Sequence, residues 1–523
     1  AAEKEQSLAQ IIQFRKEKAA KLQEMGVNPY PYVYDRTHRS TEIIDGYEKL
    51  VGKTVSAAGR LVSLRRMGKA AFFHIQDDVG KIQCYVKRDN VGEEDYEVFK
   101  LLDMGDIVGA KGNVFTTKTG EISIDVAELA VLAKSIRPLP GSKEKDGETF
   151  HAFADKEQRY RQRHLDLVVN PEVRDVFRKR AQITSSLRAF LDQREFLEVE
   201  TPVLQPIYGG AFARPFTTHH QALDSTLYLR IADELYLKRL IIGGFDRVYE
   251  MAKDFRNEGM DKSHNPEFTM LEYYAAYVDY NFLMDFTEEL IQAAADAVGV
   301  KTVDINGTSI DLSKPYRRAG YVELLEESTG EEINISDATL LGKLCKSHGI
   351  KAEKGAHVGT LLELLMKNLV EPKLLEPTFV IDYPKAISPL AKLKRDDDSG
   401  EIVERFELFI GGRELANSFT ELTDPVDQRE RLMEQGELRQ QGDEEAQSFD
   451  EDFVRAVEVG MPPTGGVGLG VDRLVMLLTG SNNIRDVIAF PKTTSALSLM
   501  DGSPDTVSKE QLDELGILLK KKK

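Results

Sequence analysis

The spacing of apolar residues and turn signals changes once along this chain, and that change narrows the folds it can adopt. Between Thr54 and Leu132, short β-like runs follow one another, separated by turn signals such as "DVGK" and "KTGE". Five short strands in such a stretch are typical of a small closed barrel such as an OB-fold. From residue 171 onward, "PEVRDVFRKRAQITSSLRAFLDQREF" places apolar residues at helical spacing, and helices then alternate with strands. We therefore expect domains of two different architectures.

The length of the chain supports this division. At 523 residues it is too long for one ordinary hydrophobic core. The segment "RPLPGSKEKDGETFHAFADKE" combines proline, glycine and dense charge, which indicates a linker. We predict an α+β protein with the following parts: an N-terminal helix and lead-in (1–53), an OB-fold barrel (54–135), the linker (136–160), a larger domain (161–495) with a helical insertion at about 315–375, and a C-terminal appendage (496–523).

Charge and cysteine content limit the class of protein further. The formal net charge is −18, but residues 1–150 contain 23 basic and 23 acidic side chains, so the negative excess lies beyond them. The N-terminal part is therefore the less repulsive surface for a polyanion such as a nucleic acid. Cys84 and Cys345 lie far apart and without a metal-ligand pattern, which indicates buried thiols rather than a disulfide or a zinc site.

The N-terminal sequence predicts a helix over residues 3–25 and gives no sign of membrane targeting. Its cations Arg15, Lys16, Lys18 and Lys21 either touch phosphate or form a solvated helix face. No apolar run reaches the ~18 residues of a membrane-spanning helix, and the basic-then-apolar order of a signal peptide is missing. We expect a soluble cytoplasmic protein with no membrane partner.

Three polar segments of the larger domain carry the chemistry. "DFRNEGMDKSHNPEF", residues 254–268, gathers cations, acids and a histidine in a loop between two strands. "RFELFIGGRELANSF" offers Glu407 and Glu414 to a divalent cation, unless both are structural. "GVGLGVDR" either packs its glycines between a strand and a helix, or lets the backbone and Arg473 approach a phosphate. The chain has no G-x-x-x-x-G-K-[ST] loop and no serine nucleophile elbow.

In combination these segments resemble a known family. "FRNEG" with "HNPEF" resembles the second signature motif of the class II aminoacyl-tRNA synthetases, and the paired glutamates with "GLGVDR" resemble the third. The helix at 171–196 with "VETPVL" resembles the first motif, which builds the dimer interface in that family and includes Pro202. With an OB-like domain in front, the chain is similar to the lysyl, aspartyl and asparaginyl subclass from about residue 1 to Phe490. The stretch from "YGGAF" to "RVYE" is most similar to the bacterial lysyl enzymes.

The resemblance implies a catalytic domain built on an antiparallel sheet flanked by helices, with ATP as substrate and up to three Mg²⁺ ions. It implies a homodimer whose partners are tRNA(Lys) and L-lysine. The implied ATP-binding residues are Arg256, Glu258, His264, Asn265, Phe268, Glu407 and Arg473, of which Arg256 and Arg473 are catalytic. The implied lysine-binding residues are Gly210, Glu234, Glu272, Tyr274, Asn417, Phe419 and Glu421. Mg²⁺ would bind Glu407 and Glu414, and the anticodon would contact Arg65, Phe72 and Gln83.

Charge favours lysine as the amino acid, because an ammonium group in a closed pocket needs carboxylates around it. An aspartyl or asparaginyl enzyme stays the first alternative, although an aspartate pocket would need cations where Glu234 and Glu272 stand. A catalytically silent synthetase-like protein that only binds RNA, and a paralogue that lysylates a protein, are the others. In the barrel, Phe72 and Phe73 should point to opposite faces, leaving one of them exposed.

Overall fold

The computed structural model describes residues 7–492 except 141, 146–147, 152, 154, 314, 354 and 441–447. The chain divides into two compact units, and the boundary lies between Val169 and Asn170. The segment expected to be a linker, 136–160, therefore belongs to the first unit. The appendage expected at 496–523 lies outside the described residues.

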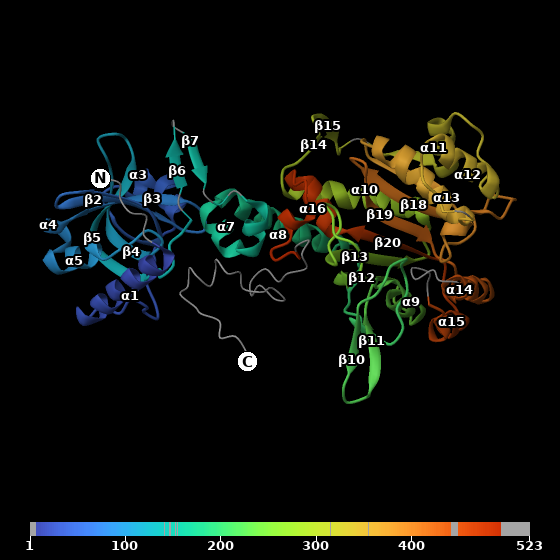
Figure 1. The fold of residues 1–523 in the computed structure, drawn as a ribbon, viewed down its shortest axis with the longest axis horizontal. Coiled ribbons are helices and arrows are strands. Elements are labelled where there is room, and N and C mark those ends of the chain that lie inside the picture. The colour runs from blue at the N-terminus through green and yellow to red at the C-terminus, as the bar shows by residue number, and fades with distance from the viewer. Residues whose placement is uncertain are drawn as a thin grey trace, which may run out of the picture. The chain divides into compact units, whose positions relative to one another are not determined.

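The first unit contains a closed five-stranded barrel with the strand order β1-β2-β3-β5-β4 (Figure 1). Burial alternates along β2, where Phe73 is fully buried and Phe72 is partly exposed. The predicted OB-fold-like barrel and the opposite orientation of these two rings are confirmed. The strands are β1 (Thr54–Met67), β2 (Ala70–Gln76), β3 (Lys81–Lys87), β4 (Ile107–Thr116) and β5 (Ile122–Ala133), and the helices α4 (Arg88–Val91) and α5 (Glu93–Lys100) connect β3 to β4.

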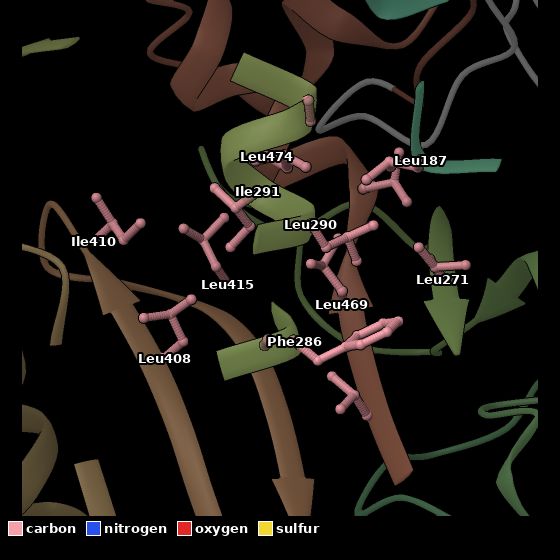
Figure 2. Close-up of a cluster of buried hydrophobic side chains, with 14 of the residues drawn as sticks. Leu187, Leu271, Phe286, Leu290, Ile291, Leu408, Ile410, Leu415, Leu469 and Leu474 are labelled. Carbon is pink, nitrogen blue, oxygen red and sulfur yellow. The ribbon is translucent and has the colours of Figure 1, made fainter. Parts of the chain in front are cut away.

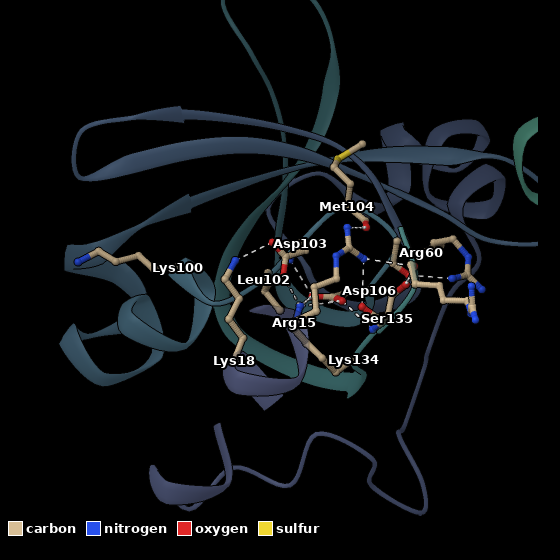
Figure 3. Close-up of polar contacts among 12 residues, drawn as sticks. Arg15, Lys18, Arg60, Lys100, Leu102, Asp103, Met104, Asp106, Lys134 and Ser135 are labelled. Carbon is tan, nitrogen blue, oxygen red and sulfur yellow. Dashed lines mark hydrogen bonds and ion pairs between the residues drawn. The ribbon is translucent and has the colours of Figure 1, made fainter. Parts of the chain in front are cut away.

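Three helices precede the barrel: α1 (Leu8–Glu24), α2 (Ser40–Asp45) and α3 (Tyr47–Leu50). On α1, Arg15 is nearly buried, and its guanidinium donates to the carbonyl oxygens of Met104 and Ser135 at 3.0 Å each (Figure 3). The Lys18 ammonium pairs with Asp103 at 2.6 Å. These two cations hold α1 against its own unit, so the idea that they touch phosphate is wrong. The other two cations of the helix, Lys16 and Lys21, are exposed.

A buried ion-pair network supports this attachment. The side chain of Lys134, just after β5, is fully buried, and its ammonium lies 2.6 Å from Asp103 and 2.8 Å from Asp106 (Figure 3). Asp106 also accepts a hydrogen bond from the Ser135 backbone N–H at 2.8 Å. Because Asp103 receives both Lys18 and Lys134, the pKa of its carboxyl lies below the ordinary value even though burial alone would raise it. Lys134 thus anchors the loop before β4, to which Lys18 attaches α1.

The segment expected to be a linker contains regular structure. The strands β6 (Ser142–Lys145) and β7 (Glu148–His151) pair as an antiparallel hairpin. Helix α6 (Lys156–Arg161) and helix α7 (Arg163–Val169) then complete the first unit. Proline and dense charge predicted a linker at 136–160 and a new domain from 161, whereas the boundary between the units lies after Val169 and the segment forms a hairpin and two helices.

The second unit is built on an eight-stranded sheet with the order β16-β17-β18-β19-β20-β13-β12-β8 (Figure 1). Neighbouring strands are antiparallel except at the two edges, where β16 pairs with β17 and β8 pairs with β12 in parallel. The predicted antiparallel sheet is confirmed for all central strands. The strands are β8 (Leu197–Glu198), β12 (Arg247–Phe255), β13 (Glu267–Ala276), β16 (Arg317–Gly320), β17 (Thr378–Pro384), β18 (Ile402–Ile410), β19 (Arg413–Thr420) and β20 (Thr464–Gly470).

Helices cover one face of this sheet: α8 (Pro171–Asp192), α10 (Tyr280–Ala297), α16 (Val471–Thr479) and α17 (Ile484–Val487). The side chains of Leu271, Leu408 and Leu469 meet Leu290 and Ile291 of α10 in a buried cluster (Figure 2). Each such side chain stabilises the fold by about 1.5–3 kcal/mol. Since successive residues of a strand point to opposite faces, their neighbours point to the other side of the sheet.

The predicted helical insertion lies between β16 and β17. It consists of α11 (Tyr321–Thr329), α12 (Ala338–Ser347), α13 (Val358–Leu365), a π-helical turn η1 (Met366–Val370) and a 3₁₀ turn η2 (Glu371–Lys373). The expected range of about 315–375 also takes in β16, which is a strand of the large sheet. The insertion has its own buried cluster, which includes Leu325, Leu341 and Leu362.

Smaller elements complete the second unit: a three-stranded sheet of β9 (Leu204–Gln205), β10 (Thr217–His220) and β11 (Ser225–Leu229), the hairpin β14 (Thr302–Ile305) and β15 (Thr308–Asp311), the 3₁₀ turn η3 (Lys385–Ile387), and the helices α9 (Glu234–Ile242), α14 (Pro425–Gln440) and α15 (Glu451–Glu458). Within the described ranges, no helix has the length and apolar character needed to cross a membrane. Cys84 and Cys345 are both free and buried, as predicted.

The buried network around Lys134 gives a stability prediction. Replacing Lys134 by Met leaves Asp106 buried without its cation, which should lower the free energy of unfolding of the first unit by about 3–5 kcal/mol. The measurement is hydrogen exchange of β4 and β5 peptides in the full chain across a urea series. Lys100→Met is the control, because its pair with Glu97 is exposed and should contribute little. Similar shifts in both variants would contradict the importance of the network.

Candidate active site

A cavity of about 370 Å³ opens on the sheet face that the helices α8, α10 and α16 leave uncovered. Its walls come from β13, β18, β19 and β20, from the loop between β12 and β13, and from the start of α16. Most of the residues predicted to bind substrates or a cation line it, namely Gly210, Glu234, Arg256, Glu258, His264, Asn265, Phe268, Glu272, Tyr274, Glu407, Glu414, Asn417, Phe419 and Arg473. Glu421 is the exception, since it lies buried behind the wall.

The floor of the cavity is a trough along β20, where two glycines carry no side chain. The strand pairing aligns two rows of residues across β13, β20 and β19, namely Glu272, Gly468, Asn417 and Tyr274, Gly466, Phe419. Directly paired residues face the same side of a sheet, so the larger side chains of each row stand on both banks of the trough. Gly466 also allows close packing, because a Cβ there would lie 2.1 Å from the ring of Tyr274.

Buried carboxylates line the inner end of the trough. Glu272 accepts a hydrogen bond from the backbone N–H of Asp233 and another from the Tyr274 hydroxyl, each at 3.1 Å. Burial, together with repulsion from Asp254 and Glu234, raises the pKa of Glu272 to about 8. Within the part of the chain that the structure describes, no cation pairs with this carboxyl, so a bound ammonium group would favour its ionised form.

A second carboxylate pair at this end is already bridged by a lysine. Glu234 begins α9, and its Oε1 lies 2.5 Å from the ammonium of Lys238 one helical turn later. The same ammonium forms an ion pair with Glu421. Sequence reasoning missed Lys238, although its i, i+4 spacing from a predicted site glutamate on a helix was a usable signal.

Three acids beneath the inner end of the trough lie close enough together to hold a metal ion, but the guanidinium of an arginine already pairs with two of them. Carboxylate oxygens of Asp233, Asp254 and Glu272 lie within 4.8 Å of one another. The guanidinium of Arg230 pairs with Asp233 at 3.0 Å and with Asp254 at 3.4 Å. Burial nevertheless raises the pKa of Asp254 to about 6, against the opposing effect of Arg256 and Arg230. The cluster is thus a buried group of acids beneath the trough that Arg230 compensates only in part.

The loop between β12 and β13 forms the outer end of the cavity. Arg256 follows β12 directly, and its guanidinium lies over the ring of Phe268 at 5.1 Å from the centroid. The Arg256 Nε also donates to the carbonyl of Ile231 at 3.3 Å. Glu258 is exposed on the same loop, whereas Asn265 is buried and donates to the carbonyl of Glu267. The loop thus holds a cation beside an aromatic ring.

A second cation stands at the start of α16. Arg473 donates to the carbonyl of Glu414 at 2.8 Å and lies 3.1 Å from Nε2 of His264. The other ring nitrogen of His264 lies 2.8 Å from a carboxylate oxygen of Asp261. Both residues of this pair were predicted as phosphate ligands, and they reach the same place from segments 209 positions apart in sequence.

A buried acid fixes the orientation of α16. Asp472 accepts hydrogen bonds from the backbone N–H of Thr269 at 2.7 Å and from the guanidinium of Arg180 at 2.5 Å. Arg180 lies on α8, so one carboxylate joins α8, β13 and α16. Sequence reasoning noted Asp472 only as part of a motif and gave it no role.

Glu407 and Glu414, the predicted ligands of a divalent cation, both line the cavity. Burial raises the pKa of Glu407 to about 7, opposed by Arg405 at 2.6 Å and reinforced by Glu414 and Glu371. Arg405 also donates to Asn417, and it is a second residue that sequence reasoning missed. This surplus of carboxylate oxygens fits Mg²⁺, which prefers oxygen ligands. A cation there would relieve the repulsion that the local arginine leaves uncompensated.

The predicted anticodon-contacting residues share the outer face of the barrel in the first unit. Strand pairing aligns Arg65 with Phe72, and Phe72 with Tyr85. Phe72 and Tyr85 stack with centroids 4.5 Å apart and ring planes at 21°. Gln83, two positions from Tyr85, donates to Glu121 at 2.6 Å. The result is an aromatic platform with polar groups at its edge.

Pro202, predicted to be part of a dimer interface, is exposed between β8 and β9. Its carbonyl accepts a hydrogen bond from the side chain of Gln205 at 3.2 Å. Its place in a dimer interface stays a prediction.

Comparisons with known proteins agree on one family. The model of the class II tRNA synthetases of the D, K and N group matches residues 155–494, and that of the OB-fold nucleic acid binding domain matches 55–138. The chain is 51% identical over 488 residues to a lysine–tRNA ligase of Carboxydothermus hydrogenoformans, covering 93% of this chain and 98% of that protein. It is 50% identical to the lysine–tRNA ligase of Pelotomaculum thermopropionicum, covering 93% and 96%. Identity to the Porphyromonas gingivalis lysine–tRNA ligase is 49%, covering 91% and 84%.

The trough predicts a contrast between its two glycines. Gly466→Ala should lower the free energy of unfolding of the second unit by about 1–3 kcal/mol, because the new Cβ would overlap Tyr274 and Glu421. Gly468→Ala is the matched control, since its Cβ would meet nothing closer than 3.8 Å. Calorimetry of the full chain measures the difference. Equal transition temperatures would contradict the tight packing at Gly466.

Proposed function

Because the chain belongs to the class II tRNA synthetases, and within them to the lysine–tRNA ligases, we propose that its cavity makes lysyl-adenylate from L-lysine and ATP and transfers lysine to the terminal adenosine of tRNA(Lys). The observation that carries this proposal is the polarity of the cavity. Its inner end presents Glu234 and Glu272, which suit ammonium groups, and its outer end presents Arg256 and Arg473, which suit phosphates. Lysine and ATP therefore meet in the middle, over the glycine trough.

In this proposal the residues align the two substrates and stabilise charge. A carboxylate oxygen of lysine attacks the α-phosphorus of ATP, and the bond from that phosphorus to the oxygen bridging the α- and β-phosphates breaks, releasing pyrophosphate. Arg256 contacts the α-phosphate as negative charge develops on it, and Phe268 stacks on the adenine. The 3′-terminal hydroxyl of the tRNA then attacks the lysyl carbonyl, and AMP leaves. Neither step needs a covalent enzyme intermediate, because alignment accounts for the rate.

ATP binding completes the assignment at the outer end. Glu258 binds the adenine amino group, and Asn265 is a further ligand of ATP. His264 and Arg473 hold the terminal phosphates. Mg²⁺ held by Glu407 and Glu414, up to three ions in all, would neutralise the leaving pyrophosphate. At the inner end, Gly210, Tyr274, Asn417, Phe419 and Glu421 complete the lysine subsite.

Charge argues against the alternative substrates. Aspartate would need a cation at its side-chain end, but the cations at the inner end, Lys238 and Arg230, already pair with carboxylates of the chain. A silent RNA-binding paralogue is disfavoured because Arg256, Glu407 and Arg473 all face one cavity. In the first unit, the aromatic platform of Phe72 and Tyr85, together with Arg65, supports a role in reading the anticodon.

Assembly and location follow from the family. We propose a cytoplasmic homodimer whose interface includes the segment around Pro202, and whose functional parts are those given by the sequence: 54–135 for the anticodon, 161–495 for catalysis and 496–523 as an appendage.

The proposed reaction is tested by measuring pyrophosphate exchange into ATP with each of the twenty amino acids and with norleucine. Lysine should support exchange, while aspartate, asparagine and norleucine should not, because only lysine carries a side-chain ammonium for the carboxylates at the inner end. Arg256→Ala should lower the exchange rate by ~100- to 1000-fold, the effect of losing one transition-state donor. Arg256→Lys keeps the charge without the planar fork and should fall between. Exchange with aspartate but not lysine would falsify the proposal.

The barrel platform predicts separate effects on the two half-reactions. Phe72→Ala combined with Gln83→Ala should leave lysine-dependent pyrophosphate exchange unchanged. Charging of tRNA(Lys) should weaken by a few kcal/mol in kcat/KM, since stacking contributes ~1–3 kcal/mol per base. The control is Glu128→Gln, an exposed residue of β5 that pairs with Lys111. Equal losses in both assays would mean that the platform supports the fold and does not read RNA.

A further inference from the structure

Lys238 is the one cation that contacts two of the predicted lysine-binding carboxylates within the described residues. It is fully buried on α9, with its ammonium 2.5 Å from Glu234 and in an ion pair with Glu421. Its ammonium also lies over the rings of Phe419, at 5.2 Å, and Phe453, at 5.9 Å. Lys238 does not line the cavity, so it reaches both carboxylates from behind the wall.

The two carboxylates differ in how they reach the trough. Glu234 lines the cavity directly. Glu421 lies below it, but its Oε1 would be 2.5 Å from a Cβ on Gly466, and Gly466 forms part of the trough floor. The ammonium group of Lys238, which lies behind both carboxylates, therefore fixes the orientation of the Glu234 and Glu421 side chains.

The net charge of these three side chains indicates what Lys238 does. Glu234, Glu421 and Lys238 together carry one net negative charge, which one ammonium group of a substrate balances. Without Lys238, two adjacent carboxylates would share a buried space, and in such pairs one carboxyl keeps its proton. The carboxyl would then be a weaker acceptor for a cation.

We propose that Lys238 is a positioning residue that keeps Glu234 and Glu421 ionised and aimed at the trough, and so sets the affinity of the site for the side-chain ammonium of lysine. This inference rests on the proposed function. It assigns the residue no contact with the substrate, because it acts through the two glutamates.

The charged surroundings support this role. Although burial alone would lower the pKa of Lys238, Glu234 and Glu421 raise it above its ordinary value, so the ammonium stays charged. Burial still raises the pKa of both Glu234 and Glu421, even with Lys238 beside them. The other titratable or charged groups that act on the pair are Glu272 and Tyr274 on β13 and Arg405 on β18. Lys238 therefore opposes the effect of burial on the pKa of both acids.

The test is the pH dependence of lysine binding in Lys238→Met, a neutral variant of similar length. At pH 7 the KM for lysine in pyrophosphate exchange should rise roughly 10- to 100-fold, corresponding to one or two pKa units on a carboxyl. The KM should then fall by about tenfold per pH unit toward pH 9, as that carboxyl loses its proton. The KM for ATP should stay within about twofold, because the ATP contacts lie at the other end of the cavity.

Two further variants separate positioning from simple support. Arg239→Met removes the next cation of α9, which pairs with Asp450 and not with the site glutamates, and should leave the pH profile unchanged. Lys238→Met combined with Glu421→Gln removes the cation and one of its two acids, which keeps the net charge of the group at minus one, so the KM for lysine should lose the steep pH dependence of the single variant. The double variant also covers the case in which the single variant does not fold, because it buries one uncompensated carboxylate in place of two.

Each outcome decides between the two proposals. If the parent protein shows no lysine-dependent exchange, the proposed function fails and this inference fails with it. If the parent exchanges with lysine but Lys238→Met keeps the parent KM and pH profile, only the role of Lys238 is overturned. A double variant that keeps the steep pH dependence of KM would overturn it as well.

Discussion

The missing side chains of Gly466 and Gly468 are the constraint on which the site depends. A central strand flanked by β13 and β19 would normally fill both faces of the sheet with side chains. Here one face packs Leu469 against α10, while on the other face Gly466, Gly468 and Gly470 line the cavity. The trough exists because a strand buried on one side supplies rigidity, and its glycines supply space. Larger residues on both banks then define what fits between them.

Charge is arranged around this trough in three pairings that differ in completeness. Arg230 pairs with Asp233 and Asp254 beneath the floor, and Lys238 pairs with Glu234 and Glu421 from behind the wall, one cation for two acids in each case. Glu407 pairs with Arg405 and Glu414 with Arg473, while Glu371 adds a third acid beside them. Buried charges are stable only when paired, so the incomplete pairings mark where a substrate ammonium or a divalent cation would add most.

The sequence predicted the parts of this arrangement that local pattern encodes. Alternation identified the barrel and the opposite faces of Phe72 and Phe73, and motif order identified the residues that line the cavity. It did not identify Lys238, Arg405 or Arg230, because their roles depend on partners brought together by strand register and helix packing. It also placed a linker where the hairpin of β6 and β7 lies, since charge and proline describe a boundary but not the pairing within it. Long-range charge balance is the information that a linear pattern lacks.

The lack of long-range information in a sequence pattern also explains why phosphate contacts were predicted for helix α1. Arg15 and Lys18 were candidates for phosphate contact because a basic helix face has two uses that the sequence cannot separate. In the structure both cations satisfy oxygens of their own unit, so they add nothing to an RNA-binding surface. With residues 1–150 neutral overall, electrostatic attraction alone would be weak and would not distinguish one RNA from another. In our proposal, recognition by this unit comes from stacking and base-edge contacts, which the partly exposed platform of Phe72 and Tyr85 can provide and a cationic helix cannot.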